Sequence, residues 1–181
     1  MSDSCLILYL IWGGLMLRII RSMSALDIAQ IMTVYKESNR SNGRENYPHL
    51  SENLQLLQAE QDFYAYLGEF LSNEGSFYAV WAPEGCYTAA LRLERYCDGL
   101  LLTALETAPE ARRRGNASAL VQAVLVYLAE HGRTKVYSHV SKGNPASIAV
   151  HTTCGFEKIH EYAVYIDGSV FHNCCTFCYS I

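Results

Sequence analysis

The chain reads Leu102-Thr-Ala-Leu-Glu-Thr107-Ala-Pro109-Glu-Ala-Arg112-Arg-Arg-Gly115-Asn-Ala117 where a predicted strand meets the most regular predicted helix. The helix has apolar residues at offsets 0, 3, 4, 7, 8 and 11 from Ala117, which is the spacing of one helical face. A short loop before such a helix points unpaired backbone N–H groups at one spot, where the helix dipole adds positive potential. The segment therefore predicts an anion site between a strand and a helix.

The side chains of this loop also suit an anion. The three arginines at 112–114 can donate charge-assisted hydrogen bonds to phosphate. Gly115 permits a close backbone approach or unusual dihedral angles, and the small Ala117 leaves room for a phosphate on the next turn. The Gly-Lys-Ser/Thr of a nucleotide triphosphate loop and the Gly-x-Gly-x-x-Gly of a dinucleotide site are both missing. The loop indicates a diphosphate of another kind, or else a solvated basic loop.

Upstream of this segment the sequence predicts a strand, two helices and an antiparallel meander. The first strand begins at Leu17, and Ser24 is the expected N-cap of a helix that extends to Tyr35. The polar stretch 38–49 is expected to be a loop, and Ser51 to begin a second helix that ends near Leu71. Three apolar runs, separated by Pro83-Glu-Gly85 and Cys97-Asp-Gly99, then read as meander strands over residues 76–81, 87–96 and 100–107.

Downstream, the elements are expected to be a helix, a strand, a short helix and two closing strands, over residues 117–131, 135–140, 144–155, 158–166 and 169–179. The predicted order is β α α β β β α β α β β. A strand, crossover helix and strand between residues 100 and 140 need packing on both sides. We therefore expect an α/β fold with helices on both faces of the sheet.

The loop after the third meander strand resembles a motif of the GNAT superfamily of N-acetyltransferases. In that family a strand ends in a Pro-x-x-Arg turn, and the pattern Arg/Gln-x-x-Gly-x-Gly/Ala binds the pyrophosphate of acetyl-CoA. Pro109, Arg112, Gly115 and Ala117 match these positions. The family's fold implies a mixed, mostly antiparallel sheet.

A second GNAT motif follows in register. Its pattern is Asn-x-x-Ala, then a Tyr four residues on, then Gly-Phe, and the chain has Asn144, Ser147, His151 and Gly155-Phe156 at those spacings. The element order extends the resemblance from about Leu17 to the C-terminus. Two motifs in the correct order are far more specific than either one alone.

The resemblance implies a site for acetyl-CoA as co-substrate, without a metal. The strand before Arg112 would splay from the strand after the helix, so that pantetheine inserts there and pairs with backbone. Asn144 would contact the amide arm of the cofactor, and it is also a good N-cap before Pro145. The implied cofactor-binding residues are Leu105, Thr107, Arg112, Arg113, Arg114, Gly115, Asn116, Ala117, Asn144 and Ser147.

The candidate catalytic residues are His151 and Glu106. His151 stands where many relatives carry a Tyr that protonates the departing thiolate, and a histidine with a pKa of about 6.5 can donate that proton. The alternative is a buried histidine whose ring is satisfied by a backbone carbonyl. Glu106, beside the expected splay point, is the first candidate for general base, and His139 in the opposite strand is the second. Each can instead be an ordinary strand residue.

The expected reaction is direct transfer of an acetyl group from acetyl-CoA to a primary amine of a small molecule or peptide. Backbone N–H groups on the splayed strand would stabilise the oxyanion. The stretch 39–49 and the turn at Asp167-Gly168 are expected to shape the acceptor pocket. Two alternatives are a non-catalytic acyl-CoA-binding module, prompted by the missing Tyr, and an RNA binder that uses the basic loop. A homodimer is compatible with this interpretation, as is a monomer.

Composition fits one globular domain with neither a nucleic acid nor a membrane as partner. The chain has 181 residues, half of them hydrophobic and 18% charged, unlike chains that stay disordered. Its net charge of -4 supplies no global positive field to attract nucleic acid. Seven cysteines without a regular framework fit free thiols in a reducing cytoplasm.

The two ends of the chain raise two further questions. In the tail, a strand would hold Cys174 and Cys178 about 13 Å apart, too far for one zinc ion. The stretch from Cys5 to Ile20 is almost wholly apolar but too short to span a membrane, and no Lys or Arg precedes Arg18, unlike the positively charged start of a signal peptide. We expect a single domain over residues 16–181, with residues 1–15 as an N-terminal extension; a natural start at Met16 is one interpretation.

Overall fold

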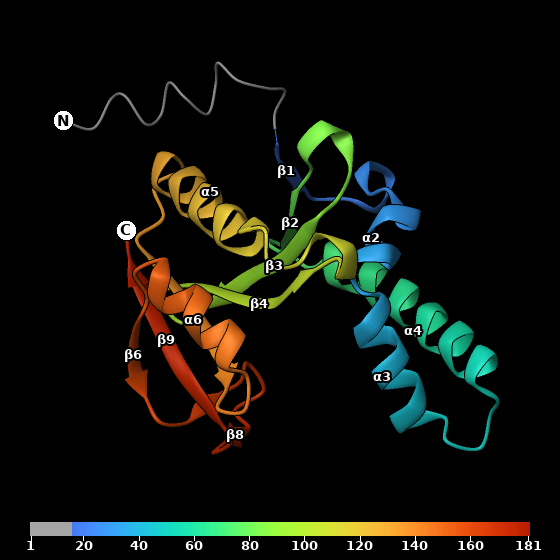
Figure 1. Ribbon diagram of the computed structural model, residues 1–181. Helices are drawn as coiled ribbons and strands as arrows, with labels where there is room; N and C mark the ends of the chain where they lie inside the picture. The colour runs from blue at the N-terminus through green and yellow to red at the C-terminus, as the bar shows by residue number, and fades with distance from the viewer. Residues whose placement is uncertain (1–15) are drawn as a thin grey trace.

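The computed structural model describes residues 16–181 as one mixed sheet with helices on both faces (Figure 1). The strand order is β1-β2-β3-β4-β5-β9-β6, and β7 and β8 form a separate pair. Neighbouring strands are antiparallel except for β4 and β5, which are parallel, so the mostly antiparallel sheet is confirmed. The strands are β1 Leu17–Ile20, β2 Phe77–Trp81, β3 Ala89–Tyr96, β4 Gly99–Thr107, β5 Lys135–Ser141, β6 Glu157–His160, β7 Ala163–Val164, β8 Val170–Phe171 and β9 Cys174–Ser180.

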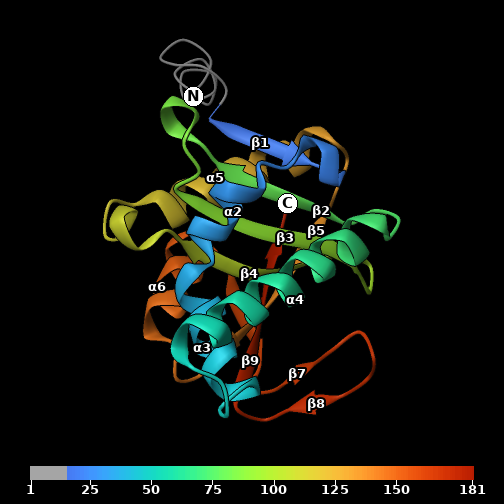
Figure 2. The same ribbon diagram turned by 90° about the vertical axis from the view of Figure 1, so that its right-hand side faces the viewer.

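The helices divide between the two faces of this sheet (Figures 1 and 2). One face carries α2, α3 and α4, and the other carries α5 and α6. Single 3-10 turns connect some of the elements. The α-helices are α2 Ile28–Val34, α3 Lys36–Asn46, α4 Glu52–Ser72, α5 Asn116–Glu130 and α6 Pro145–Thr153, and the 3-10 turns are η1 Met23–Ala25, η2 Pro83–Gly85 and η3 Pro109–Ala111.

Two hydrophobic cores follow from the alternation of side chains along the strands. On β3, Leu91 and Leu93 join the core under α5, whereas Ala90 joins the core under α2 and α4. The predicted apolar face of α5 is confirmed, because its members are buried against the sheet. They are Leu120, Val121, Val124, Leu125 and Leu128.

The expected loop at 38–49 is wrong, since most of it is helix α3. Its polar, glycine-containing sequence has low helix propensity, and packing against α4 overrides that preference. A Cβ on Gly43 would lie 2.5 Å from the carbonyl oxygen of Gln55, so only glycine allows this close approach. Gln55 also donates to the carbonyls of Tyr47 and Leu50, which fixes the connection between the two helices.

Two boundaries also differ from expectation. The N-cap of α2 is Asp27, whose carboxylate accepts from the backbone N–H of Gln30, and Ser24 lies in the preceding 3-10 turn. The expected strand at 158–166 divides into β6 and β7, and the one at 169–179 divides into β8 and β9. The pairing of β6 with β9 shifts register between Lys158 and His160 and ends with His160 opposite Thr176.

Two structural tests concern a membrane and a metal. Within residues 16–181, no helix is both long and apolar enough to cross a bilayer. The same residues contain no cluster of three or more His, Cys, Asp or Glu side chains arranged to hold a metal ion. The apolar stretch 1–15 lies outside the described residues.

Candidate functional site

The parallel strands β4 and β5 are paired only near their beginnings. Leu100, Leu101 and Leu102 face Val136, Tyr137 and Ser138, and no later residue of either strand pairs with the other. β4 nevertheless continues to Thr107 and β5 to Ser141. The facing backbone edges of residues 103–107 and 139–141 are thus not used for β4–β5 pairing, which is the splay that the family resemblance implied.

A bulge in β4 marks the start of this splay. Ala90 on β3 faces Glu106, whereas Arg92 faces Thr103, so β4 has one extra residue between them. Ala104 takes a positive φ of 50° there. The hydroxyl of Tyr35 donates to the Ala104 carbonyl at 2.7 Å, which ties the bulge to α2. The bulge redirects the following backbone toward the loop at the N-terminus of α5.

The loop before α5 presents a group of unpaired backbone donors. Gly115, with a φ of 79°, is the N-cap of α5, and Arg113 also has a positive φ, of 59°. The side chain of Asn116 donates to the Ala111 carbonyl at 2.8 Å and so closes the turn. Within the described chain, the backbone N–H groups of residues 113–118 donate to no other group. These free donors and the dipole of α5 suit a phosphate group.

The three arginines of this loop have different surroundings. The guanidinium of Arg112 donates to the Thr107 carbonyl and to Glu37, and it lies 4.0 Å from Glu106. Arg112 therefore connects the loop to α3 with its side chain. Arg113 and Arg114 are exposed and have no ion-pair partner within residues 16–181, so they remain available to an anion.

Helix α6 carries the second predicted group of site residues. The side chain of Asn144 accepts from the backbone N–H of Ser147 at 3.0 Å, so the N-cap interpretation is confirmed. His151 lies one turn beyond Ser147 and is only 1% exposed. Its ring contacts Phe156 and Phe177, and Phe177 faces Ser138, the last β5 residue that pairs with β4. His151 therefore packs near the base of the splay, on the α5 side of the sheet.

The hydrogen bonds of His151 define its protonation. Its Nδ1 lies 2.8 Å from the Ser147 carbonyl oxygen, so this nitrogen carries the proton of the neutral ring. Its Nε2 is buried and has no partner within residues 16–181. Burial lowers the pKa of His151, although the bond to Ser147 opposes that shift. At neutral pH the ring is neutral and presents a lone pair at Nε2.

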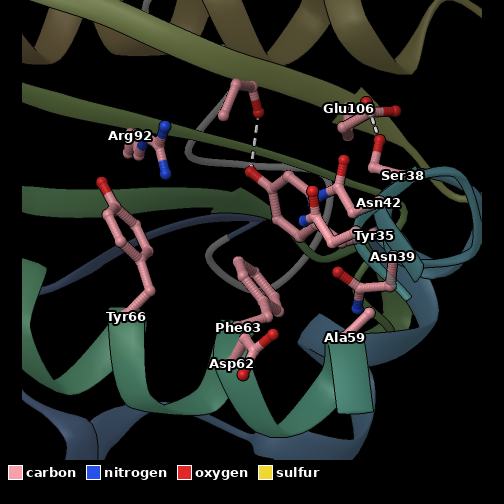
Figure 3. A pocket seen from close by; sticks show the side chains of 12 residues that line it. Tyr35, Ser38, Asn39, Asn42, Ala59, Asp62, Phe63, Tyr66, Arg92 and Glu106 are labelled. Carbon is pink, nitrogen blue, oxygen red and sulfur yellow. Dashed lines mark hydrogen bonds between the residues drawn. The ribbon is translucent and has the colours of Figure 1, made fainter. Parts of the chain in front are cut away.

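A cavity of about 340 Å³ lies on the opposite face, between α3, α4 and the strands β3 and β4 (Figure 3). Glu106 and Ala104 contribute to its wall from β4. The carboxylate of Glu106 accepts from the hydroxyl of Ser38 at 2.6 Å and is 29% exposed. The remaining lining residues are Tyr35, Ser38, Asn39, Asn42, Asn46, Ala59, Asp62, Phe63, Tyr66 and Arg92.

The structure brings some predicted acceptor residues to this cavity and leaves others apart. Three asparagines from the stretch 39–49 line it, although from a helix instead of a loop. The turn at Asp167-Gly168 is not part of its lining. His139 lies between the rings of Tyr96 and Tyr165, with both ring nitrogens buried and unpartnered within the described chain, and burial lowers its pKa.

Sequence reasoning missed Arg92, Tyr35 and Tyr66 as cavity residues. A signal for Arg92 was present, because a charge at an otherwise apolar strand position, in Ala-Ala-Leu-Arg-Leu, has to face something polar. Tyr35 and Tyr66 gave no such signal, since aromatic residues at helical spacing are usually core residues. Their place in the cavity depends on how α2 and α4 cross the sheet.

The sequence matches one known family over residues 31–156, that of the Acetyltransferase (GNAT) family. No curated protein matches the chain. The match covers the bulge, the loop before α5 and the whole of α6. It ends at Phe156, the last residue of the second motif.

Solved structures of N-acetyltransferases share the fold. The PaiA N-acetyltransferase of Thermoplasma acidophilum in complex with coenzyme A is 12% identical, with a TM-score of 0.61, over 92% of this chain and 100% of that one. Spermidine N-acetyltransferase of Vibrio cholerae in complex with CoA and spermine is 18% identical, with a TM-score of 0.60, over 91% and 95%. The ribosomal-protein-S18-alanine N-acetyltransferase of Escherichia coli is 20% identical, with a TM-score of 0.52, over 67% and 76%.

Proposed function

The chain belongs to the GNAT family of acetyltransferases, and from this premise we propose that it transfers the acetyl group of acetyl-CoA to a primary amine of a small molecule or peptide. One observation carries the proposal. The splay of β4 from β5 lies between a backbone anion site on one side and a cavity with an acidic wall on the other. A diphosphate cofactor and an amine can thus reach the same stretch of β4 from opposite faces of the sheet.

The residues of the chain fit acetyl-CoA as co-substrate. The free N–H groups of residues 113–118 and the side chains of Arg113 and Arg114 would hold the pyrophosphate. The unpaired β4 edge at Leu105 and Thr107 would pair with the pantetheine arm. Asn144 and Ser147, at the start of α6, would lie beside that arm. Two of the similar structures were solved with coenzyme A, which supports this choice of cofactor.

The proposed reaction is a direct transfer. The amine nitrogen attacks the thioester carbonyl, the C–S bond breaks, and backbone N–H groups near the β4 bulge stabilise the oxyanion. Glu106 takes the proton that the amine loses, directly or through a water molecule. His151 would return a proton to the sulfur only in its imidazolium form, because Nε2 carries no proton in the neutral ring.

The amine acceptor is the least defined part of this proposal. One similar structure was solved with spermine, and another similar protein acetylates the alanine of a ribosomal protein, so the fold accepts both small and peptide amines. We also propose a reducing compartment such as the cytoplasm, because the described cysteines are all free thiols. A homodimer remains compatible with the fold.

The decisive experiment supplies acetyl-CoA and a panel of small amines and peptides, while free thiol and acceptor mass are recorded. We expect thiol release that depends on the acceptor, with a matching gain of one acetyl group in its mass. Binding of acetyl-CoA without any acceptor-dependent thiol would instead indicate a non-catalytic acyl-CoA-binding module. Steep salt dependence of RNA binding would indicate the basic-loop alternative.

A further inference from the structure

Arg92 enters the acceptor cavity from the sheet. It lies on β3 between the buried residues Leu91 and Leu93, and its side chain projects to the face that α4 covers (Figure 3). Its Nε donates to the hydroxyl of Thr103 at 3.0 Å, next to the β4 bulge. The guanidinium is therefore held at the point where β4 begins to splay from β5.

Within the described residues Arg92 has no direct ion-pair partner, and the carboxylate that feels its charge is that of Glu94, two residues along β3, where Arg92 opposes the rise in pKa that burial causes. Its guanidinium carbon lies 4.6 Å from the ring centroid of Tyr66 and 5.6 Å from that of Phe70, so aromatic faces hold its plane. None of the ion pairs formed within residues 16–181 includes Arg92. A mostly buried cation without a counter-ion is unfavourable. An anionic group of a ligand would supply the missing partner.

The other charged residues of the cavity are acidic and already hold hydrogen bonds. Glu106 accepts from Ser38, and Asp62 accepts from Tyr47. Glu106 faces Ala90 across the strands, and Ala90 lies two residues from Arg92, which is about 6.6 Å along a strand. The cavity is thus polarised, with the guanidinium of Arg92 at one end and the carboxylate of Glu106 at the other (Figure 3).

We propose that the acceptor is a small amine that also carries a carboxylate, an amino acid or a close analogue. Its carboxylate binds the fork of Arg92 in the bidentate manner that planar guanidinium groups favour, while its amine lies at Glu106. The cavity volume of about 340 Å³ is at the small end of ligand sites, which suits such a molecule. This inference rests on the proposed acetyl transfer and narrows its substrate class.

The test compares matched pairs of amines with the full-length protein and acetyl-CoA. Each pair is an amino acid and its carboxamide, which share the amine and differ in the anionic group; aminoalkyl phosphonates distinguish a carboxylate site from a general anion site. Steady-state kcat and KM are measured for the wild type, Arg92→Met and Arg92→Lys. For each pair, the kcat/KM of the acid is divided by that of the amide. Comparing this ratio between variants cancels the intrinsic reactivity of each amine.

We expect the wild type to prefer the acid of each pair. Arg92→Met should lower kcat/KM for the acids by about 30-fold or more, mainly through KM, and change that for the amides by less than about threefold. Arg92→Lys should restore part of the loss. The matched control is Arg95→Met. Arg95 is an exposed arginine of the same strand that pairs with Glu74 outside the cavity, so this variant should leave kcat/KM unchanged for both the acids and the amides.

Three outcomes separate this inference from the proposed function. Amides acetylated as well as acids by both wild type and Arg92→Met would overturn the carboxylate site and leave the acetyltransferase intact. The inference also fails if acetyl-CoA binds but no acid of the panel is acetylated or raises the melting temperature. Absence of both acetyl-CoA binding and thiol release would overturn the proposed function itself. If Arg92→Met does not fold, the ratio of kcat/KM for acid and amide is still compared between the wild type and Arg92→Lys. An equal preference for acids and amides in both proteins would then overturn the carboxylate site.

Discussion

The proposed protonation of the leaving thiolate depends on the buried side chain of His151. Because its pKa is lowered by burial, the imidazolium form that can protonate sulfur is a minority species at neutral pH. A tyrosine at this position would keep its proton to about pH 10. The substitution of Tyr by His therefore changes the pH range over which the same step can operate.

The first prediction concerns His151→Phe and His151→Tyr. If the histidine is the proton donor, the Phe variant should lose about 10²–10⁴ in kcat with little change in acetyl-CoA affinity. The wild-type kcat should fall as pH rises through a pKa below the usual 6.5, whereas the Tyr variant should remain active to higher pH. Pre-steady-state and steady-state rates between pH 5 and pH 9 would measure both effects.

His160→Phe, which removes an exposed histidine of β6, is the control for this series. It should change neither kcat nor the pH dependence of kcat. The Phe variant also removes a buried nitrogen without a partner, so its stability should not fall sharply. Full activity of His151→Phe with an authentic acceptor would make His151 a packing residue.

Gly115 carries the second residue-scale prediction. Valine there should abolish the stabilisation by acetyl-CoA, because a side chain at a φ of 79° strains the N-terminus of α5 and projects into the open space where a phosphate would bind. Saturating acetyl-CoA should raise the wild-type melting temperature by several degrees, as a ligand at 100 times its Kd adds about 2.7 kcal/mol. Differential scanning fluorimetry with and without acetyl-CoA provides the measurement.

Gly132 provides a matched control, since it ends the same helix with a φ of 68° and also faces open space. Gly132→Val should lose similar intrinsic stability and keep the acetyl-CoA shift. Equal shifts in the two variants would contradict the assignment of the loop as the pyrophosphate site.

Among the elements, the strand β4 has the most demanding geometry, because its bulge starts the splay. The Ala104 carbonyl at that bulge accepts from the buried hydroxyl of Tyr35. Tyr35→Phe would leave this carbonyl unsatisfied and should lower the free energy of unfolding by about 1–3 kcal/mol. It should also lower kcat if the β4 backbone stabilises the oxyanion as proposed, since that backbone loses its anchor.

Chemical denaturation and steady-state kinetics would check this prediction on β4. Tyr64→Phe is the control, because the side chain of Tyr64 is 52% exposed on α4, and it should stay within about 0.5 kcal/mol of the wild type. A Tyr35→Phe variant with wild-type stability and kcat would show that the bulge does not need this hydrogen bond.

The pairing of α3 with α4 gives a second prediction at the scale of elements. A Cβ at Gly43 would meet the Gln55 carbonyl, so Gly43→Ala should destabilise the protein by about 1–3 kcal/mol through overpacking. Gly68→Ala, in the neighbouring helix α4, meets nothing and should instead stabilise it by about 0.5–1 kcal/mol. Urea denaturation compares the two, and a loss of equal size in both would refute the close-packing argument.

For the whole molecule, the question is where the folded domain begins. The first backbone contact of the described chain is made by the Met16 carbonyl, which accepts from the N–H of Ala82 at 2.7 Å, and β1 follows directly. A variant that begins at Met16 should therefore fold and bind acetyl-CoA like the full chain. Melting temperature, acetyl-CoA shift and light scattering would compare them.

Loss of solubility or of assembly in that shorter variant would make residues 1–15 structural. The natural control is the full chain under the same conditions, because the two differ only in the apolar extension. A difference confined to oligomeric state would point to a role in assembly and leave the single-domain prediction for residues 16–181 unaffected.

Most strands and helices could be predicted from local sequence, because period-2 and period-3.6 apolar patterns and turn residues such as Gly, Pro and Asn act over a few residues. The helix α5, the N-cap at Asn144 and the strand, crossover helix and strand from β4 to β5 were all predictable in this way. The cluster of unpaired backbone donors before α5 was predictable too, since these donors lie at a helix N-terminus. Such features need no knowledge of distant neighbours.

Tertiary structure alone decided the rest, because those features depend on contacts between residues far apart in the chain. Helix α3 exists because Gly43 packs on the backbone of α4, although its own sequence favours a loop. The tautomer and lowered pKa of His151 come from burial against Phe177 and from the bond to Ser147, and spacing on a helix could show only its face. Arg92 becomes a cavity residue without a direct ion-pair partner among the described residues only when α4 places the Tyr66 ring against its guanidinium. Local pattern sets the elements of this protein, and the burial created by their packing sets the chemistry of its side chains.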